Sequence, residues 1–327
     1  MSLELSWFGH DRYTQRSNYF GYYNAIHQTR AALTRLGVRF TAKSNVCINH
    51  IAPHSYEPFP GKFNVAITMY ESEDIIEEAA ERVRKADLII VPSQFCKRAF
   101  QKWTGKPVEV VPLGVDHVPF IERTVSKDKD DPFVFLWVGA FNARKGWFAL
   151  TAAWDAFFAK FPFCQLYIKT TTFNKDAEKK FTRGNAVIDA RNISNEEMAE
   201  LYKKAHVFVL PTMGEGWGMT VAEAMSSGCP TITTEYSGVL EFANRRNCFF
   251  APHKLERIKA NMGGDSRAPD GKFLFAVTDI PKLAMTMANV MNTYENSLLV
   301  GKRAAKDMQQ FTWDRTAKEL VEILRKI

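Results

Sequence analysis

The run Val207–Leu210 is followed after three residues by a glycine-rich turn and then by a helical pattern. Four consecutive apolar residues, two of them valines, are typical of a strand that is buried on both faces of a parallel sheet. After the turn of Gly214–Gly218, apolar residues recur at helical spacing until Gly228, which ends the helix before Pro230. Because a buried parallel strand needs helices on both faces of its sheet, this stretch predicts an α/β fold.

Two carboxylates accompany the predicted start of this helix. Glu215 lies in the turn, and Glu223 follows after seven intervening residues. Glycines let a ligand approach the backbone, and the N–H groups at a helix start attract an anion. Ionised carboxylates instead accept hydrogen bonds from hydroxyl groups. The combination predicts a ligand with a central diphosphate and hydroxyl groups at both ends, such as a sugar nucleotide. The alternative is an ordinary strand, turn and helix with two solvated glutamates.

The spacing of Glu215 and Glu223, with Gly-Trp-Gly-Met directly after the first, resembles the Glu-x7-Glu signature of retaining, family-4-type glycosyltransferases with the GT-B fold. The stretch Gly139–Gly146 resembles the glycine, basic residue and Lys-Gly loop with which that family holds the donor diphosphate. The resemblance covers most of the chain and is strongest from residue 133 to residue 241. Ala140 is a departure, because many members carry an arginine there, and His206 stands where aspartate is frequent.

The resemblance implies a role for each matching residue. Glu223 is expected to bind the ribose hydroxyls and Glu215 those of the donor sugar. Arg144 and Lys145, the basic pair, are expected to stabilise charge on the leaving diphosphate. The implied catalytic residues are Glu215, Arg144 and Lys145, and the implied donor-binding residues are Gly139, Gly216, Trp217, Gly218, Met219, Thr220, Glu223 and Asn192. The implied reaction moves a hexose-type sugar from a UDP- or GDP-sugar to an acceptor hydroxyl, with retention of configuration and without a metal or other cofactor.

Apolar runs alternate with helical segments along the whole chain, which predicts parallel, doubly wound sheets. With the resemblance, this gives a GT-B expectation of two Rossmann-like domains facing across a cleft. Residues 1–125 would form the acceptor-side domain, to which a C-terminal helix at 312–327 crosses back, and residues 126–311 the nucleotide-sugar domain. Asp128-Lys129-Asp130 is interpreted as a solvated hinge rather than a metal site. Residues 253–272 are expected to form an irregular, exposed excursion, followed by helices over 280–294 and from Asp314 onward.

The acceptor side is predicted from polar residues of the first half. The candidates are His10, Gly21, His50, Glu71 and Ser93, with His54 as a further loop histidine. An aromatic loop over residues 13–23 would either stack on a sugar ring or cover the core. The resemblance is weakest in this half, so the acceptor stays open among a glycan, a lipid or lipid-linked molecule, a protein and a nucleic acid.

Composition narrows the setting of the protein. The 327 residues carry a formal net charge of +7, which suits an acidic ligand, an anionic membrane surface or nucleic acid. Five scattered cysteines without a C-x-x-C pair favour reduced thiols, and neither a signal peptide nor a membrane-spanning run is apparent. A cytoplasmic protein, peripheral at a membrane at most, is the expectation.

Other functions are open to a chain of this kind. A basic nucleic-acid- or nucleotide-binding protein without transferase activity is one alternative, and a different GT-B-like enzyme acting on a sugar nucleotide is another. An NAD-dependent oxidoreductase is disfavoured because neither half contains Gly-x-Gly-x-x-Gly after a strand. A glycosidase is disfavoured because its two carboxylates flank a scissile bond rather than a helix start.

Overall fold

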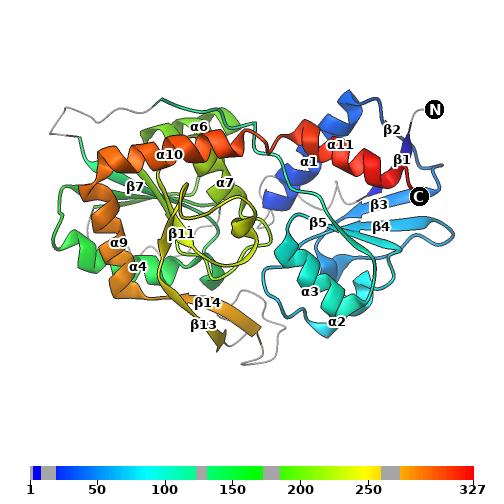
Figure 1. The fold of residues 1–327 in the computed structure, drawn as a ribbon, viewed down its shortest axis with the longest axis horizontal. Coiled ribbons are helices and arrows are strands. Elements are labelled where there is room, and N and C mark those ends of the chain that lie inside the picture. Colours follow the sequence, from blue (N-terminus) through cyan, green and yellow to red (C-terminus); the bar gives the residue numbers. More distant parts are fainter. Residues whose placement is uncertain (1–2, 9–19, 123–130, 172–184, 259–272) are drawn as a thin grey trace. The chain divides into compact units, whose positions relative to one another are not determined.

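The computed structural model describes residues 3–8, 20–122, 131–171, 185–258 and 273–327 (Figure 1). They form two compact units. The first contains Met1–Asp116, Glu215–Trp217 and Gln310–Ile327, and the second contains His117–Gly214 and Gly218–Gln309. The boundary predicted after residue 125, the sequence Asp128-Lys129-Asp130 and the acceptor candidate His10 lie outside the described residues.

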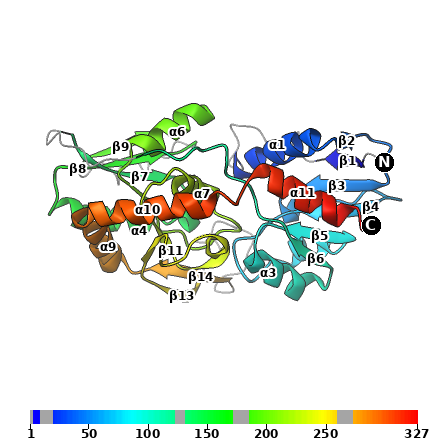
Figure 2. The same ribbon diagram turned by 45° about the horizontal axis from the view of Figure 1, so that its top comes forward.

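The first unit is built on a six-stranded parallel sheet with the order β2-β1-β3-β4-β5-β6. Its strands are β1 (Glu4–Phe8), β2 (Arg39–Phe40), β3 (Val46–His50), β4 (Phe63–Ile67), β5 (Leu88–Val91) and β6 (Val108–Val110). Its helices are α1 (Phe20–Arg35), α2 (Glu77–Val83), α3 (Gln94–Thr104) and α11 (Trp313–Leu324), with a 3-10 turn at Pro53–Ser55. Helix α11 packs along α1, as Figure 2 shows.

Helix α11 completes the first unit although it is distant in sequence from the rest of that unit. Its buried face includes Trp313, Ala317 and Leu320. The hydroxyl of Thr316 donates to the carbonyl oxygen of Pro112 at 2.7 Å, and the backbone N–H of Trp313 donates to a carboxylate oxygen of Asp116 at 2.9 Å. Apolar burial and directional bonds therefore both hold this helix to the first unit.

The second unit contains another six-stranded parallel sheet, in the order β12-β11-β10-β7-β8-β9. Its strands are β7 (Phe133–Val138), β8 (Cys164–Lys169), β9 (Ala186–Asp189), β10 (Val207–Leu210), β11 (Thr231–Thr234) and β12 (Phe249–Ala251). The helices are α4 (Trp147–Phe158), α6 (Asn195–Lys204), α7 (Met219–Ser226), α9 (Ile280–Asn292) and α10 (Tyr294–Met308), with 3-10 turns at Ala143–Lys145 and Ser237–Glu241. An antiparallel ribbon of β13 (His253–Ile258) and β14 (Phe273–Thr278) is separate from the sheet.

The predicted α/β class and its two parallel, doubly wound sheets are confirmed. The strand predicted at Val207–Leu210 is β10, and all four of its residues are buried. Ser194 caps α6, because its hydroxyl accepts from the backbone N–H of Glu197 and the Glu197 carboxylate accepts from the N–H of Ser194.

Two expectations about local structure were wrong, and one helix was missed. Residues 253–258 form strand β13 rather than part of an irregular excursion, and four of its six side chains are exposed, so apolar alternation is missing. Helix α10 was not predicted at all. Helix α1 begins at Phe20, inside the segment predicted as an aromatic loop, and there Tyr22 is buried. In the part of the chain that the structure describes, every helix is too short or too polar to cross a bilayer.

Candidate functional site

In the second unit, the residues that lead from β10 into the glycine-rich turn are bonded to the loop that carries Arg144 and Lys145. The N–H of Met213 donates to the carbonyl oxygen of Arg144 at 2.7 Å, and Nη1 of Arg144 donates to the carbonyl oxygen of Gly214 at 2.6 Å. The hydroxyl of Thr212 donates to the Arg144 carbonyl oxygen at 3.1 Å. The Arg144 loop is therefore fixed to Thr212–Gly214 by both backbone and side-chain bonds.

The basic loop itself is a 3-10 turn whose shape depends on its two flanking residues. Asn142 caps it by accepting from the N–H of Lys145 at 3.1 Å. Gly146 closes it with a φ of 70°, and a Cβ there would lie 1.9 Å from the carbonyl oxygen of Pro211. Only glycine fits a left-handed residue so close to the neighbouring strand end. Gly139, at the start of the loop, donates its N–H to the carbonyl oxygen of Lys169.

The start of α7 has the features of an anion site. Gly218 precedes the helix in a left-handed conformation with a φ of 97°, and no side chain caps the first turn. The hydroxyl oxygen of Thr220 is buried in that turn and has no hydrogen-bond partner among the described residues. An uncapped helix start attracts negative charge, and a buried hydroxyl without a partner costs free energy until a ligand bonds it. Met219 and Thr220 are both half-buried.

Glu223 lies on the same helix and is buried, with 7% of its surface exposed. Its two oxygens have different partners. Oε1 accepts from Nε2 of His117 at 3.0 Å, and Oε2 accepts from the hydroxyl of Tyr202 at 2.8 Å. Burial and the charge of Glu223 hold the pKa of Tyr202 well above its ordinary value, so this hydroxyl stays a donor. Glu223 is thus not a solvated surface residue, and neither of its partners was predicted as a site residue.

Glu215–Trp217 belong to the first unit, so the two glutamates of the predicted signature are divided between the units. Ser93, an acceptor-side candidate, caps α3 and donates its hydroxyl to the carbonyl oxygen of Gly216 at 2.7 Å. A Cβ on Gly216 would lie 2.7 Å from Cβ of Met69, so the segment passes close to the end of β4. Trp217 packs edge-on against Phe311, and Glu215 is buried, with 5% exposed.

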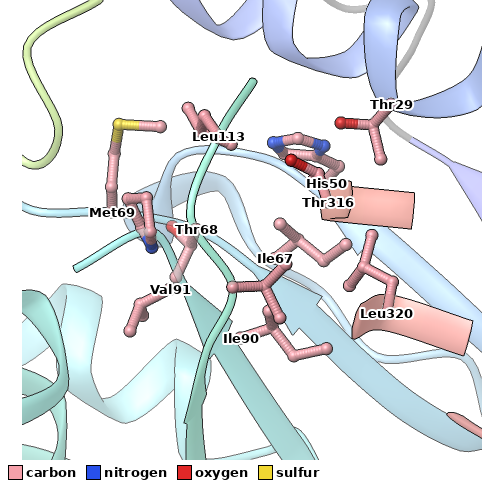
Figure 3. A pocket seen from close by; sticks show the side chains of 12 residues that line it. Thr29, His50, Ile67, Thr68, Met69, Ile90, Val91, Leu113, Thr316 and Leu320 are labelled. Carbon is pink, nitrogen blue, oxygen red and sulfur yellow. The ribbon is translucent and has the colours of Figure 1, made fainter. Parts of the chain in front are cut away.

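The other acceptor candidates are spread over the first unit. Gly21 is exposed in the first turn of α1, and Glu71 is half-buried after β4. His50, at the end of β3, is buried beside the rings of Trp7 and Tyr22. It lines a cavity of about 10 Å³ together with Thr29 and Thr316, as Figure 3 shows. This cavity holds at most one water molecule. In the second unit, the donor candidate Asn192 is exposed.

A second buried charge cluster lies at the ends of β8 and β9. Nζ of Lys169 is 3.6 Å from a carboxylate oxygen of Asp189 and donates to the carbonyl oxygens of Thr170 and Arg191. Burial lowers the pKa of Lys169, while hydrogen bonds from Arg191 lower that of Asp189. The Lys169 ammonium thus bonds neighbouring oxygens of the protein, and the cluster stabilises the ends of β8 and β9 beside Gly139.

Known proteins resemble this chain in sequence. Residues 132–263 match the family model described as "Glycosyl transferases group 1". Sulfoquinovosyl transferase SQD2 of Arabidopsis thaliana is 24% identical over 243 residues, which are 70% of this chain and 42% of that protein. Mannosylfructose-phosphate synthase of Agrobacterium fabrum is 28% identical over 131 residues, 36% of this chain and 29% of that protein. The chain thus spans less than half the length of these relatives.

Solved structures show the fold. Sucrose-phosphate synthase of Thermosynechococcus elongatus superposes with a TM-score of 0.65 at 15% identity, covering 93% of this chain and 78% of that one. The Anabaena protein HepE, in complex with UDP and glucose, superposes with a TM-score of 0.67 at 11% identity over all of both chains. With its two six-stranded parallel sheets, this chain therefore has the GT-B fold.

Proposed function

We propose that this protein is a retaining glycosyltransferase that moves a hexose-type sugar from a UDP- or GDP-sugar to an acceptor hydroxyl. The proposal rests on two features of α7, which are its uncapped start and its buried carboxylate. An uncapped helix start with an unpartnered Thr220 hydroxyl suits a phosphate, and the buried carboxylate of Glu223 on the same helix suits hydroxyl groups. The names of the relatives support it, since sulfoquinovosyl transfer and mannosylfructose-phosphate synthesis both move a sugar.

In the proposed reaction the bond from the anomeric carbon to the diphosphate breaks, and the acceptor oxygen bonds that carbon on the same face of the sugar. The proton of the acceptor hydroxyl passes to the leaving diphosphate. Negative charge then grows on the diphosphate oxygens. The N–H groups at the start of α7, Lys145 and Arg144 would stabilise it, because preorganised donors gain strength where charge develops. Arg144 is already anchored to Gly214 through Nη1, so its guanidinium need not be ordered when the donor binds.

The test is release of nucleoside diphosphate from a panel of UDP- and GDP-sugars, with and without simple sugar and lipid acceptors. We expect one donor to be consumed, and nuclear magnetic resonance of the product to show the anomeric configuration of the donor. Binding of UDP or GDP without any turnover would favour a nucleotide-binding protein instead. Failure of every nucleoside diphosphate to bind would overturn the proposal.

Activity is expected to survive removal of divalent metal ions. The described residues contain no group of three or more histidine, cysteine, aspartate or glutamate side chains that could hold a metal, and the proposed charge stabilisation uses protein cations and amides. The measurement is turnover after dialysis against EDTA, compared with turnover after Mg²⁺ or Mn²⁺ is restored. A complete loss that either metal reverses would contradict the expectation.

The two glutamates are expected to affect binding differently. Glu223→Gln should weaken nucleoside diphosphate and whole donor by the same factor, because both contain the ribose. Glu215→Gln should weaken only the donor or slow the transfer. A hydrogen bond to a charged group is worth about 1.5–3 kcal/mol, so losses of roughly tenfold to a hundredfold are expected. Calorimetric titration of both isosteric variants with UDP or GDP measures this. Equal losses of nucleoside diphosphate affinity would reject the division of roles.

A further inference from the structure

The carboxylate of Glu223 accepts hydrogen bonds from two residues that the sequence analysis did not predict as site residues. His117 bonds Oε1 and Tyr202 bonds Oε2. A carboxylate can only accept hydrogen bonds, so Nε2 of His117 carries the proton in this contact. The side chains of His117 and Glu223 are 9% and 10% exposed, and Tyr202 is fully buried. Removing either donor would leave part of a buried charge without a partner, which is costly.

These two bonds leave acceptor positions for further hydrogen bonds on the carboxylate of Glu223. Each carboxylate oxygen has two acceptor positions, and one on each oxygen is filled from inside the protein. One position per oxygen remains for a ligand. Two neighbouring hydroxyls on one sugar ring are the matching donor pair, since each can bond one oxygen of the same carboxylate. The inner donors fix the plane of the carboxylate and thereby the direction in which it accepts.

His117 is itself attached to the helix that carries Glu223. The hydroxyl of Ser226, in the last turn of α7, donates to the carbonyl oxygen of Val118 at 2.8 Å. The carbonyl oxygen of Ser227 accepts from the N–H of Ile121 at 3.1 Å. The segment 117–121 therefore runs along the end of α7 within the second unit, which places the imidazole beside the carboxylate.

We propose that His117 is a positioning residue that orients Glu223 to accept the two ribose hydroxyls of the donor nucleotide, with Tyr202 as the second anchor. The inference rests on the proposed function, because it takes the ligand of Glu223 to be a ribose. His117 bonds the carboxylate of Glu223. Its effect must therefore appear only in the part of the binding that the ribose hydroxyls supply.

The experiment compares a nucleoside diphosphate with its 2′-deoxy form, using UDP or GDP, whichever binds the wild-type protein. Calorimetry gives both dissociation constants for wild type, His117→Leu, His117→Gln and Tyr202→Phe. In wild type we expect the ribose form to bind at least about tenfold more tightly, as for loss of one bond to a charged group. His117→Leu and Tyr202→Phe should reduce this ratio toward one, because they should weaken the ribose form more than the deoxy form, which retains only its 3′-hydroxyl as a donor to Glu223. His117→Gln, whose amide can still donate to Glu223, should retain part of the ratio.

The outcomes separate this inference from the proposed function. Equal weakening of both nucleotides by His117→Leu, or no weakening of either, overturns the positioning role. A wild-type protein that binds both nucleotides equally well also overturns it, while nucleotide binding stands. If no nucleoside diphosphate binds, the proposed function fails and the inference with it. His253→Leu, on β13, is the matched control and should keep the wild-type ratio.

Discussion

Acidification from pH 7 to pH 3.5 is expected to lower the free energy of unfolding of the first unit by on the order of 4 kcal/mol through His50 alone. Burial lowers the pKa of His50 from 6.5 to about 3, and neither ring nitrogen has a hydrogen-bond partner among the described residues. Above pH 6.5 the imidazole is neutral in both states. Below pH 6.5 the imidazole is protonated in the unfolded chain but stays neutral in the folded protein. The free energy of unfolding therefore falls as the pH falls toward 3.

The measurement is amide hydrogen exchange of the β3 and β4 peptides across this pH range, because exchange reports the opening of the first unit separately. His50→Leu removes the titrating group, so its stability relative to wild type should rise steadily as the pH is lowered. His27→Leu makes the same chemical change at an exposed position of α1 and should follow wild type. Parallel pH curves for wild type and His50→Leu would show that His50 does not couple protonation to folding.

Gly146→Ala is expected to be the most damaging small substitution near the proposed donor site. The left-handed conformation costs an alanine about 1–2 kcal/mol. The overlap of the new Cβ with the carbonyl oxygen of Pro211, 1.9 Å away, adds about 1–3 kcal/mol, as overpacking does elsewhere. The backbone must shift to relieve it, and the shift moves Arg144 and Lys145. Nucleoside diphosphate affinity should therefore fall together with stability.

Gly105→Ala provides the comparison, since Gly105 has a φ of 66° but nothing within 4 Å of its ideal Cβ. It carries the conformational cost without the overlap. Calorimetric unfolding and nucleotide titration of both variants separate the two contributions. Equal loss of stability in the two variants, with nucleotide affinity intact in Gly146→Ala, would show that the loop accommodates the methyl group.

The sequence predicted those parts of the fold in which apolar residues are large and regularly spaced. Strand β10 and helix α7 were predicted because an apolar run and a helical stripe meet at a glycine-rich turn. Helix α10 was missed because it packs through small residues. Its buried positions include Ser297, Gly301 and Ala304, and a Cβ on Gly301 would lie 2.3 Å from the carbonyl oxygen of Gly228. Close packing of small side chains leaves no apolar periodicity to detect.

Only those parts of the candidate site that depend on local sequence patterns were predicted. Glu223 and the Arg144 loop were recognisable from local spacing and resemblance. The bond of Glu223 to His117 joins residues 106 positions apart, and its bond to Tyr202 joins residues 21 apart. No local pattern encodes such contacts, because they exist only once β10 and α7 bring distant segments together. The burial of His50 likewise depends on rings contributed by other elements of the first unit.

The first unit is assembled from separate stretches of the chain, and this has a consequence for folding during synthesis. Thr316 of α11 bonds Pro112 across 204 residues. At about 5–20 residues per second, a ribosome needs roughly 10 to 40 s to make that interval. Domains ordinarily fold in the order in which they emerge. Here the face of α1 that α11 covers stays exposed until the second unit has been synthesised. The first unit is therefore begun first and completed last.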